Sequence, residues 1–147
     1  MDADQLAQAC AQQMFSHDNV SRAMGMNVEH MACRQSEVTM RVTAEMLNGH
    51  QTCHGGKIFC LADSAFAFAC NSENESAVAS ACSIDFLRPA RENDLLTARA
   101  FVMHQGRRTG IYNVSITNQN QELVAIFKGN SARLNQAVLP QDQRSDS

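Results

Sequence analysis

The chain of 147 residues contains no tryptophan and a single tyrosine, and it has no excess of basic side chains. Its 12 Lys and Arg residues stand against 15 Asp and Glu residues, which gives a formal charge of -3. Nucleic-acid binding depends on positive charge and on stacking rings, so this composition argues against a general nucleic-acid binder. Long apolar runs are absent too: the longest, residues 65–70, is far shorter than the roughly 20 residues of a membrane-spanning helix.

The marks of a secreted protein are also missing. The sequence begins Met-Asp-Ala-Asp, without the basic and apolar regions of a secretory signal, which predicts a soluble, cytoplasmic protein. The six cysteines include no Cys-x-x-Cys pair, and four of them lie in apolar segments, where a reduced thiol behaves as a small hydrophobic group. We therefore expect six free thiols.

What the chain does contain is typical of a globular domain: 44% hydrophobic and 18% charged residues. A domain of this length buries on the order of 70% of its unfolded surface, so it needs no disulfide or structural metal to fold. We predict one domain over residues 1–135 and a polar C-terminal tail over residues 136–147.

Hydrophobic periodicity and turn signals divide this domain into two helices and six strands. The predicted helices span residues 2–15 and 55–71, and the predicted strands span residues 27–34, 37–44, 77–87, 95–105, 109–118 and 122–134. After its two glycines the second helix has four polar residues, Lys57, Asp63, Ser64 and Asn71. A helix that is apolar on almost every side is buried, so we expect an α+β fold in which a curved antiparallel sheet wraps around this helix.

Two features of the buried helix point to chemistry. Asp63 is a lone carboxylate on an apolar helix, and burying it is costly unless it is paired, hydrogen-bonded or functional. Gly55 and Gly56 open the helix, where free N–H groups and the positive end of the dipole suit a carbonyl oxygen that gains negative charge. The alternatives are an Asp63 that faces a solvent-filled groove or caps nearby backbone, and a glycine turn without a ligand.

The stretch LNGHQTCHGGKIFCLADSAFAFACN, followed by AVASACSIDFLRP, resembles the hotdog-fold acyl-coenzyme A thioesterases, in particular those of phenylacetate degradation. The resemblance extends from Met24 to the final strand. It implies a long helix wrapped by an antiparallel sheet, and assembly into dimers and commonly tetramers. The implied reaction is hydrolysis of phenylacetyl and ring-hydroxylated phenylacetyl coenzyme A to acid and free coenzyme A, without a cofactor.

The same resemblance assigns roles to individual residues. Asp63 is the catalytic carboxylate, acting either as the general base for water or as the nucleophile. The N–H of Gly55 polarises the thioester carbonyl, with Gly56 beside it. Asn48 and His54 line the site and help to place the thioester and the water.

Helix geometry adds a constraint on this site. Gly55 and Asp63 are 8 residues apart, which on one helix is roughly 12 Å along the axis. One thioester carbon cannot lie about 3 Å from both residues. We therefore expect Gly55 of one subunit to meet Asp63 of another, in a dimer with two equivalent sites.

Three arginines are candidates for the coenzyme A phosphates, because an acidic protein must hold a polyanion with local positive charge. Arg107 and Arg108 lie together in a predicted turn, and Arg88 ends a strand before Pro89. The alternatives are two solubilising turn arginines, and an Arg88 that ties down the strand end.

Other interpretations of the same residues are weaker. His50, Cys53 and His54 lie on one short loop without a fourth ligand, so we expect no metal site, and adjacent Cys53 and His54 side chains rarely form a nucleophile–base pair. Four apolar residues suit an acyl pocket but also plain core packing: Phe59, Phe66, Phe68 and Met46.

Two alternative functions stay open. A hotdog acyl-coenzyme A hydratase or dehydratase normally pairs a histidine with a carboxylate, and this helix has no histidine. A non-catalytic acyl-coenzyme A binding protein is the other alternative, and Asp63 on an apolar helix argues against it.

Overall fold

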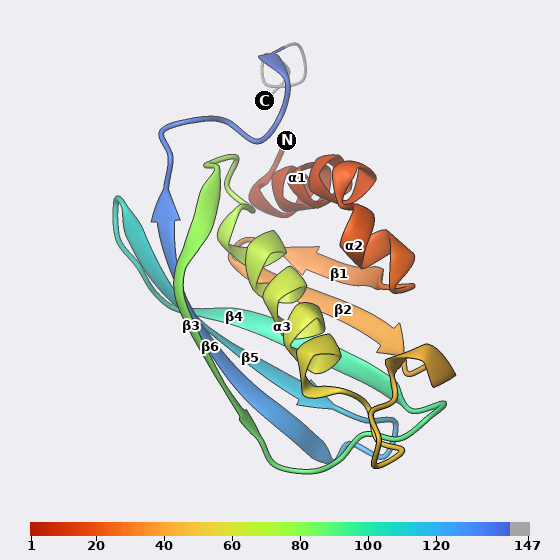
Figure 1. Ribbon diagram of the computed structural model, residues 1–147. Helices are drawn as coiled ribbons and strands as arrows, with labels where there is room; N and C mark the ends of the chain where they lie inside the picture. Colours follow the sequence, from red (N-terminus) through yellow and green to blue (C-terminus); the bar gives the residue numbers. More distant parts are fainter. Residues whose placement is uncertain (142–147) are drawn as a thin grey trace.

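Six strands form one antiparallel sheet in the computed structural model, which describes residues 1–141 (Figure 1). The strand order across the sheet is β1-β2-β4-β5-β6-β3, so β1 and β3 are its two edges. The strands are β1 (Asn27–Ala32), β2 (Gln35–Arg41), β3 (Ala77–Phe86), β4 (Leu95–Gln105), β5 (Thr109–Thr117) and β6 (Leu123–Arg133).

The sheet curves around the long helix α3 (Gly55–Cys70), which lies across its concave face in Figure 1 and contacts five of the strands. The side of α3 that faces the sheet is fully apolar, with buried Ile58, Leu61, Ala62, Ala65, Phe66, Phe68, Ala69 and Cys70. Buried alternate residues of the strands complete this core. The predicted hotdog architecture is therefore confirmed.

The first helix is longer than predicted, and a second short helix follows it. Helix α1 (Ala3–His17) begins with a capping box between Asp2 and Gln5, and α2 (Asn19–Ala23) begins at Asp18, whose carboxylate accepts from the Ser21 N–H. In the sequence, Asp18 is the N-cap residue that indicates the start of α2. A helix of five residues gives too short a periodic pattern to predict.

The prediction of the second strand was wrong at its C-terminal end. Strand β2 stops at Arg41, and a 3-10 turn, η1 (Ala44–Met46), replaces the last predicted residue. Val38, Met40 and Val42 are buried as their alternation predicted.

The beginning of the predicted tail packs on the domain. The side-chain oxygen of Asn74 accepts from the N–H groups of Val138 and Leu139 at 2.9 and 2.8 Å, and Leu139 is buried. Residues 142–147 of this tail lie outside the described residues. All six cysteines are free, and no helix within residues 1–141 has the length and apolarity to cross a membrane.

Candidate active site

The N-terminus of α3 presents one free backbone N–H. His54 caps this helix: its Nδ1 accepts from the Gly56 N–H at 3.0 Å, and its carbonyl accepts from the N–H groups of Lys57 and Ile58. The Gly55 N–H has no acceptor among residues 1–141. An uncommitted donor at the positive end of a helix can bind a carbonyl oxygen or an oxyanion.

A cavity of about 390 Å³ lies beside Gly55 and is lined by Thr52, Cys53, Gly55, Ile58, Phe86, Leu87, Arg88 and Pro89. The ring of Phe86 covers Gly55 so closely that a Cβ built on Gly55 would lie 3.0 Å from Cζ of the ring. Phe86 is 51% exposed. Phe86 was not among the predicted site residues, although it stands at the end of β3 on the same side of the strand as Ile84.

Asp63 lies in the middle of α3 and is half-buried. Burial raises the pKa of its carboxyl, and the charge of Asp18 raises this pKa further. No hydrogen bond to the Asp63 carboxylate is found within the described part of the chain. A half-buried carboxylate without a partner is free to take a proton from water.

The residue after Asp63 connects α3 to α2. The hydroxyls of Ser64 and Ser21 lie 2.7 Å apart, and the Ser21 hydroxyl donates to Asp18 at 2.6 Å. These contacts explain why a charge from the end of α1 acts on Asp63. The sequence did not indicate this contact, because nothing in the linear pattern brings residues 43 positions apart together.

Asn48 shapes the loop before α3. Its side-chain oxygen accepts from the N–H groups of His50 and Thr52 and from the Thr52 hydroxyl, at 2.9, 3.2 and 3.2 Å. Thr52 in turn lines the cavity at Gly55. The geometry therefore places Asn48 as a support of the loop, with its amide nitrogen still available for other contacts.

The three arginines do not lie together. Arg88 lines the Gly55 cavity and forms an ion pair with Glu122 at 2.8 Å. Arg107 and Arg108 lie in the turn between β4 and β5, which is at the end of the sheet where α3 finishes. Both are exposed, and within residues 1–141 neither forms an ion pair.

Several residues considered for other chemistry, Cys53 among them, are buried in the domain. Burial raises the pKa of the Cys53 thiol to about 11, so the thiolate is disfavoured. Over residues 1–141 no three His, Cys, Asp or Glu side chains form a group that could hold a metal ion. Phe66, Phe68 and Met46 are buried in the core, as plain core packing predicts.

Phe59 is half-buried, and its ring meets Phe127 edge-on at 5.3 Å. Together with Cys60, Asp63 and Ala67 it lies on the outer side of α3, where none of these four residues is fully buried. Residues three or four positions apart share one face of a helix, so this stripe is an apolar surface that contains one carboxylate.

A curved antiparallel sheet around one central helix, with a free N–H at the start of that helix and a carboxylate further along it, defines a hotdog-fold enzyme of thioester chemistry. The model of the thioesterase superfamily matches residues 50–125. The chain belongs to the thioesterase superfamily.

Similar proteins extend this result over most of the chain. The acyl-coenzyme A thioesterase PaaI of Escherichia coli is 54% identical over 124 residues, which cover 84% of this chain and 89% of that protein. The structure of E. coli PaaI, described as a protein from the phenylacetic acid degradation operon, superposes with a TM-score of 0.92 at 50% identity and covers 92% of this chain and 99% of that one. The crystal structure of a hypothetical thioesterase protein with coenzyme A from Streptococcus pneumoniae has a TM-score of 0.80 at 28% identity, and the match covers 86% of this chain and 98% of that one.

Proposed function

We propose that this thioesterase acts on coenzyme A esters of arylacetic acids, phenylacetyl and ring-hydroxylated phenylacetyl coenzyme A among them. In the cytoplasm it would return free coenzyme A from the breakdown of phenylacetate. The similarity to PaaI supports this substrate class. The proposed reaction rests on one observation: the N–H of Gly55 is free and lies beside an open cavity.

The reaction needs one donor and one carboxylate. The Gly55 N–H binds the thioester carbonyl oxygen as it becomes negative. Asp63 either takes a proton from the attacking water or attacks the carbonyl carbon itself. In the first route water adds to the carbonyl carbon, the C–S bond breaks, and the thiolate takes the proton that Asp63 received. In the second route the thiolate leaves behind an anhydride between the acyl group and Asp63. Water then hydrolyses this anhydride to the acid and the free Asp63 carboxylate, and its remaining proton goes to the thiolate.

A second subunit completes this site. Gly55 and Asp63 lie on one continuous helix, so they are roughly 12 Å apart along its axis. In a two-fold dimer with antiparallel α3 helices, each Gly55 would meet Asp63 of the partner subunit. His54 and Asn48 support the donor side of each site.

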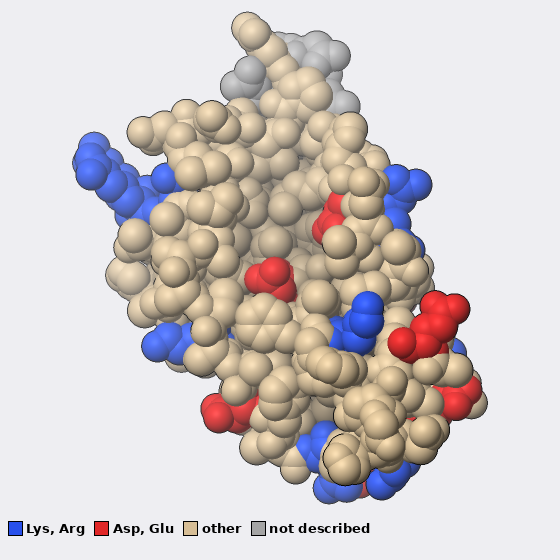
Figure 2. Space-filling model, viewed as in Figure 1, with Lys and Arg blue, Asp and Glu red and all other residues tan. Residues whose placement is uncertain are grey.

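The surface of the molecule suits such a dimer. Strand β3 is an open edge of the sheet, and three large apolar residues at or just after it, Val78, Phe86 and Leu87, are about half exposed. Figure 2 shows few charged side chains on the face that carries α3. Antiparallel pairing of two β3 edges would extend the sheet and bring the apolar outer sides of both α3 helices together. The expected tetramer would consist of two such dimers.

This dimer also determines which arginines reach the substrate. The Arg107–Arg108 turn lies toward the C-terminal end of α3, whereas Gly55 is at its N-terminal end. In the antiparallel pair this turn of the partner subunit lies at the Gly55 end. We assign the phosphates of coenzyme A to this turn, because the charge of Arg88 is already balanced by Glu122.

Incubation with phenylacetyl coenzyme A and a thiol-reactive dye tests the proposed function. Release of free coenzyme A, with acetyl and long-chain esters as comparison substrates, is the expected result. Binding without release would indicate a binding protein, and a change in double-bond absorbance with an enoyl ester would indicate a hydratase. A blank without substrate corrects for the six thiols of the protein.

A further inference from the structure

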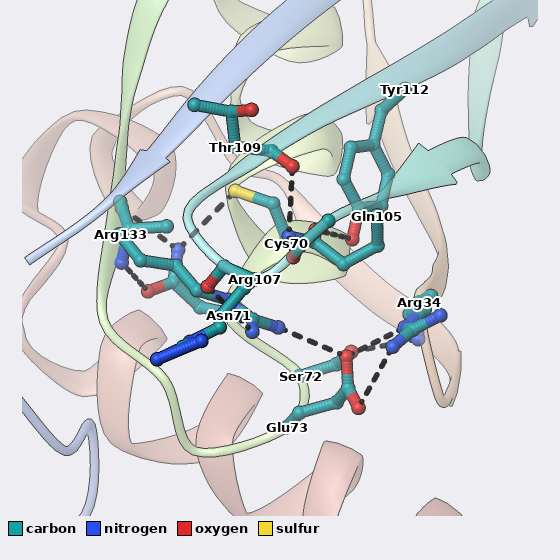
Figure 3. A network of polar contacts seen from close by, with 12 residues as sticks. Arg34, Cys70, Asn71, Ser72, Glu73, Gln105, Arg107, Thr109, Tyr112 and Arg133 are labelled. Carbon is teal, nitrogen blue, oxygen red and sulfur yellow. Dashed lines mark hydrogen bonds and ion pairs between the residues drawn. The ribbon is translucent and has the colours of Figure 1, made fainter. Parts of the chain in front are cut away.

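The turn that carries Arg107 and Arg108 is fixed from its inner side (Figure 3). Each of its four carbonyls, from residue 106 to residue 109, accepts a hydrogen bond from inside the domain. A turn whose carbonyls are all bonded inward directs its side chains outward. This leaves both guanidinium groups exposed and the backbone beneath them ordered.

Gln105 binds both ends of this turn. Its amide nitrogen donates to the carbonyls of Gly106 at 2.8 Å and Thr109 at 3.3 Å. Its side chain lies against Gly110, where any Cβ would overlap the Gln105 amide oxygen. Gly110 therefore leaves the room that this side chain needs.

Tyr112 orients the Gln105 amide. Its hydroxyl donates to the Gln105 side-chain oxygen at 2.8 Å, so the amide nitrogen must face the turn. Tyr112 is 1% exposed, and its ring meets Phe66 of α3 edge-on at 5.8 Å. Burial raises the pKa of Tyr112, so its hydroxyl stays protonated and remains a donor.

Arg133 fixes the other side of the turn. Its backbone N–H donates to the Arg108 carbonyl at 2.8 Å, and its guanidinium donates to the Arg107 carbonyl at 3.4 Å. Glu73 holds this guanidinium at 3.2 Å and also pairs with Arg34 at 2.6 Å. Arg34, Arg133 and Glu73 thus form an ion-pair cluster beside the turn that carries Arg107 and Arg108.

We propose that Gln105, oriented by Tyr112, is a positioning residue that holds the Arg107–Arg108 pair in place for the phosphate groups of coenzyme A. This inference rests on the proposed function for the identity of the ligand. A preformed pair of guanidiniums loses less conformational freedom when it binds a phosphate than a pair on a loose loop would. Gln105 itself does not touch the substrate.

The test compares Gln105→Met and Tyr112→Phe with the unchanged enzyme on two substrates. One is phenylacetyl coenzyme A; the other is the phenylacetyl thioester of N-acetylcysteamine, which ends before the phosphates. We expect KM for the coenzyme A ester to rise about three- to tenfold, the equivalent of one or two hydrogen bonds. Neither kcat nor KM for the truncated ester should change.

Two controls separate positioning from general loosening. Gln119→Met removes a glutamine in another turn, whose side chain accepts from the Leu95 N–H and donates to the Asp94 carboxylate, and should leave KM unchanged. In an Arg107→Ala/Arg108→Ala background, Gln105→Met should raise KM no further, because both changes act through one contact.

An unchanged KM in Gln105→Met, equal effects on both substrates, or an additive effect in the arginine background would overturn the inference. Calorimetry with free coenzyme A gives the same comparison without turnover. If the unchanged enzyme hydrolyses no coenzyme A ester, the proposed function fails, while the calorimetric comparison still tests the role of Gln105.

Discussion

Replacing Gly55 by proline would remove the free N–H and little else. Proline has no N–H and is favoured at the first position of a helix, which Gly55 occupies. His54 has φ -59° and ψ 132°, a conformation that suits the residue before proline, so its cap should persist. No hydrogen bond within residues 1–141 is lost, because the Gly55 N–H donates to none there.

We expect Gly55→Pro to lower kcat by about 10²–10³, which is the cost of one oxyanion donor and corresponds to about 2.7–4 kcal/mol. Gly55→Ala is the matched control, because it keeps the N–H and adds the same Cβ at 3.0 Å from the Phe86 ring. That ring is half exposed and can turn aside, so the alanine variant should lose less than about tenfold, well below the cost of a lost donor.

Steady-state kinetics with phenylacetyl coenzyme A measure kcat for each variant, and thermal melts test whether each variant is folded. The melts should show both variants folded. Equal losses in the proline and alanine variants would mean that crowding of Phe86, not the N–H, causes the defect. A proline variant with full kcat would refute the role of the Gly55 N–H.

Four other predictions follow from the same geometry. Asp63→Asn should lower kcat by about 10²–10⁴ yet raise the thermal midpoint at pH 7. Burial raises the pKa of Asp63, so the folded protein loses stability as pH rises through that pKa and the carboxylate becomes charged. The asparagine variant avoids this loss, and its higher thermal midpoint should therefore disappear in acid, where Asp63 is protonated. Asp18→Asn removes a like charge, so the acid limb of kcat/KM should move to lower pH. Subunits of Asp63→Asn and Gly55→Pro, exchanged at equal amounts, should regain about a quarter of normal activity if each site spans two subunits, and none otherwise. Charge reversal of Arg107 and Arg108 should raise KM for the coenzyme A ester far more than for the truncated one; equal effects would exclude phosphate contact.

Periodicity and turns were sufficient to predict most of the fold. The predicted helix over residues 55–71 is α3, and the strand over residues 95–105 is β4 with identical bounds. Alternation and apolar runs report burial on one face or on all faces, and that is the property that selects these elements. The short α2 lies below the length at which any period is visible.

The candidate site was predictable only where one segment carries it. The motif from His54 to Asp63 is local, and the structure keeps it on one helix with its cap. The ion pair of Arg88 with Glu122 joins residues 34 positions apart, and the cover of Gly55 by Phe86 depends on where β3 ends. Such contacts follow from the packed fold, which no local pattern encodes.

The cap at the start of α3 explains why a histidine and two glycines stand together. A Cβ on Gly56 would lie 3.2 Å from the His54 Nδ1, so the second glycine lets the imidazole fold back onto the helix. Through this cap His54 takes up the next three N–H groups and leaves that of Gly55 alone. A Cβ on Gly55 would instead press on Phe86. The two glycines therefore have different roles. Gly56 leaves room for the His54 cap, and Gly55 keeps its own N–H accessible from the cavity.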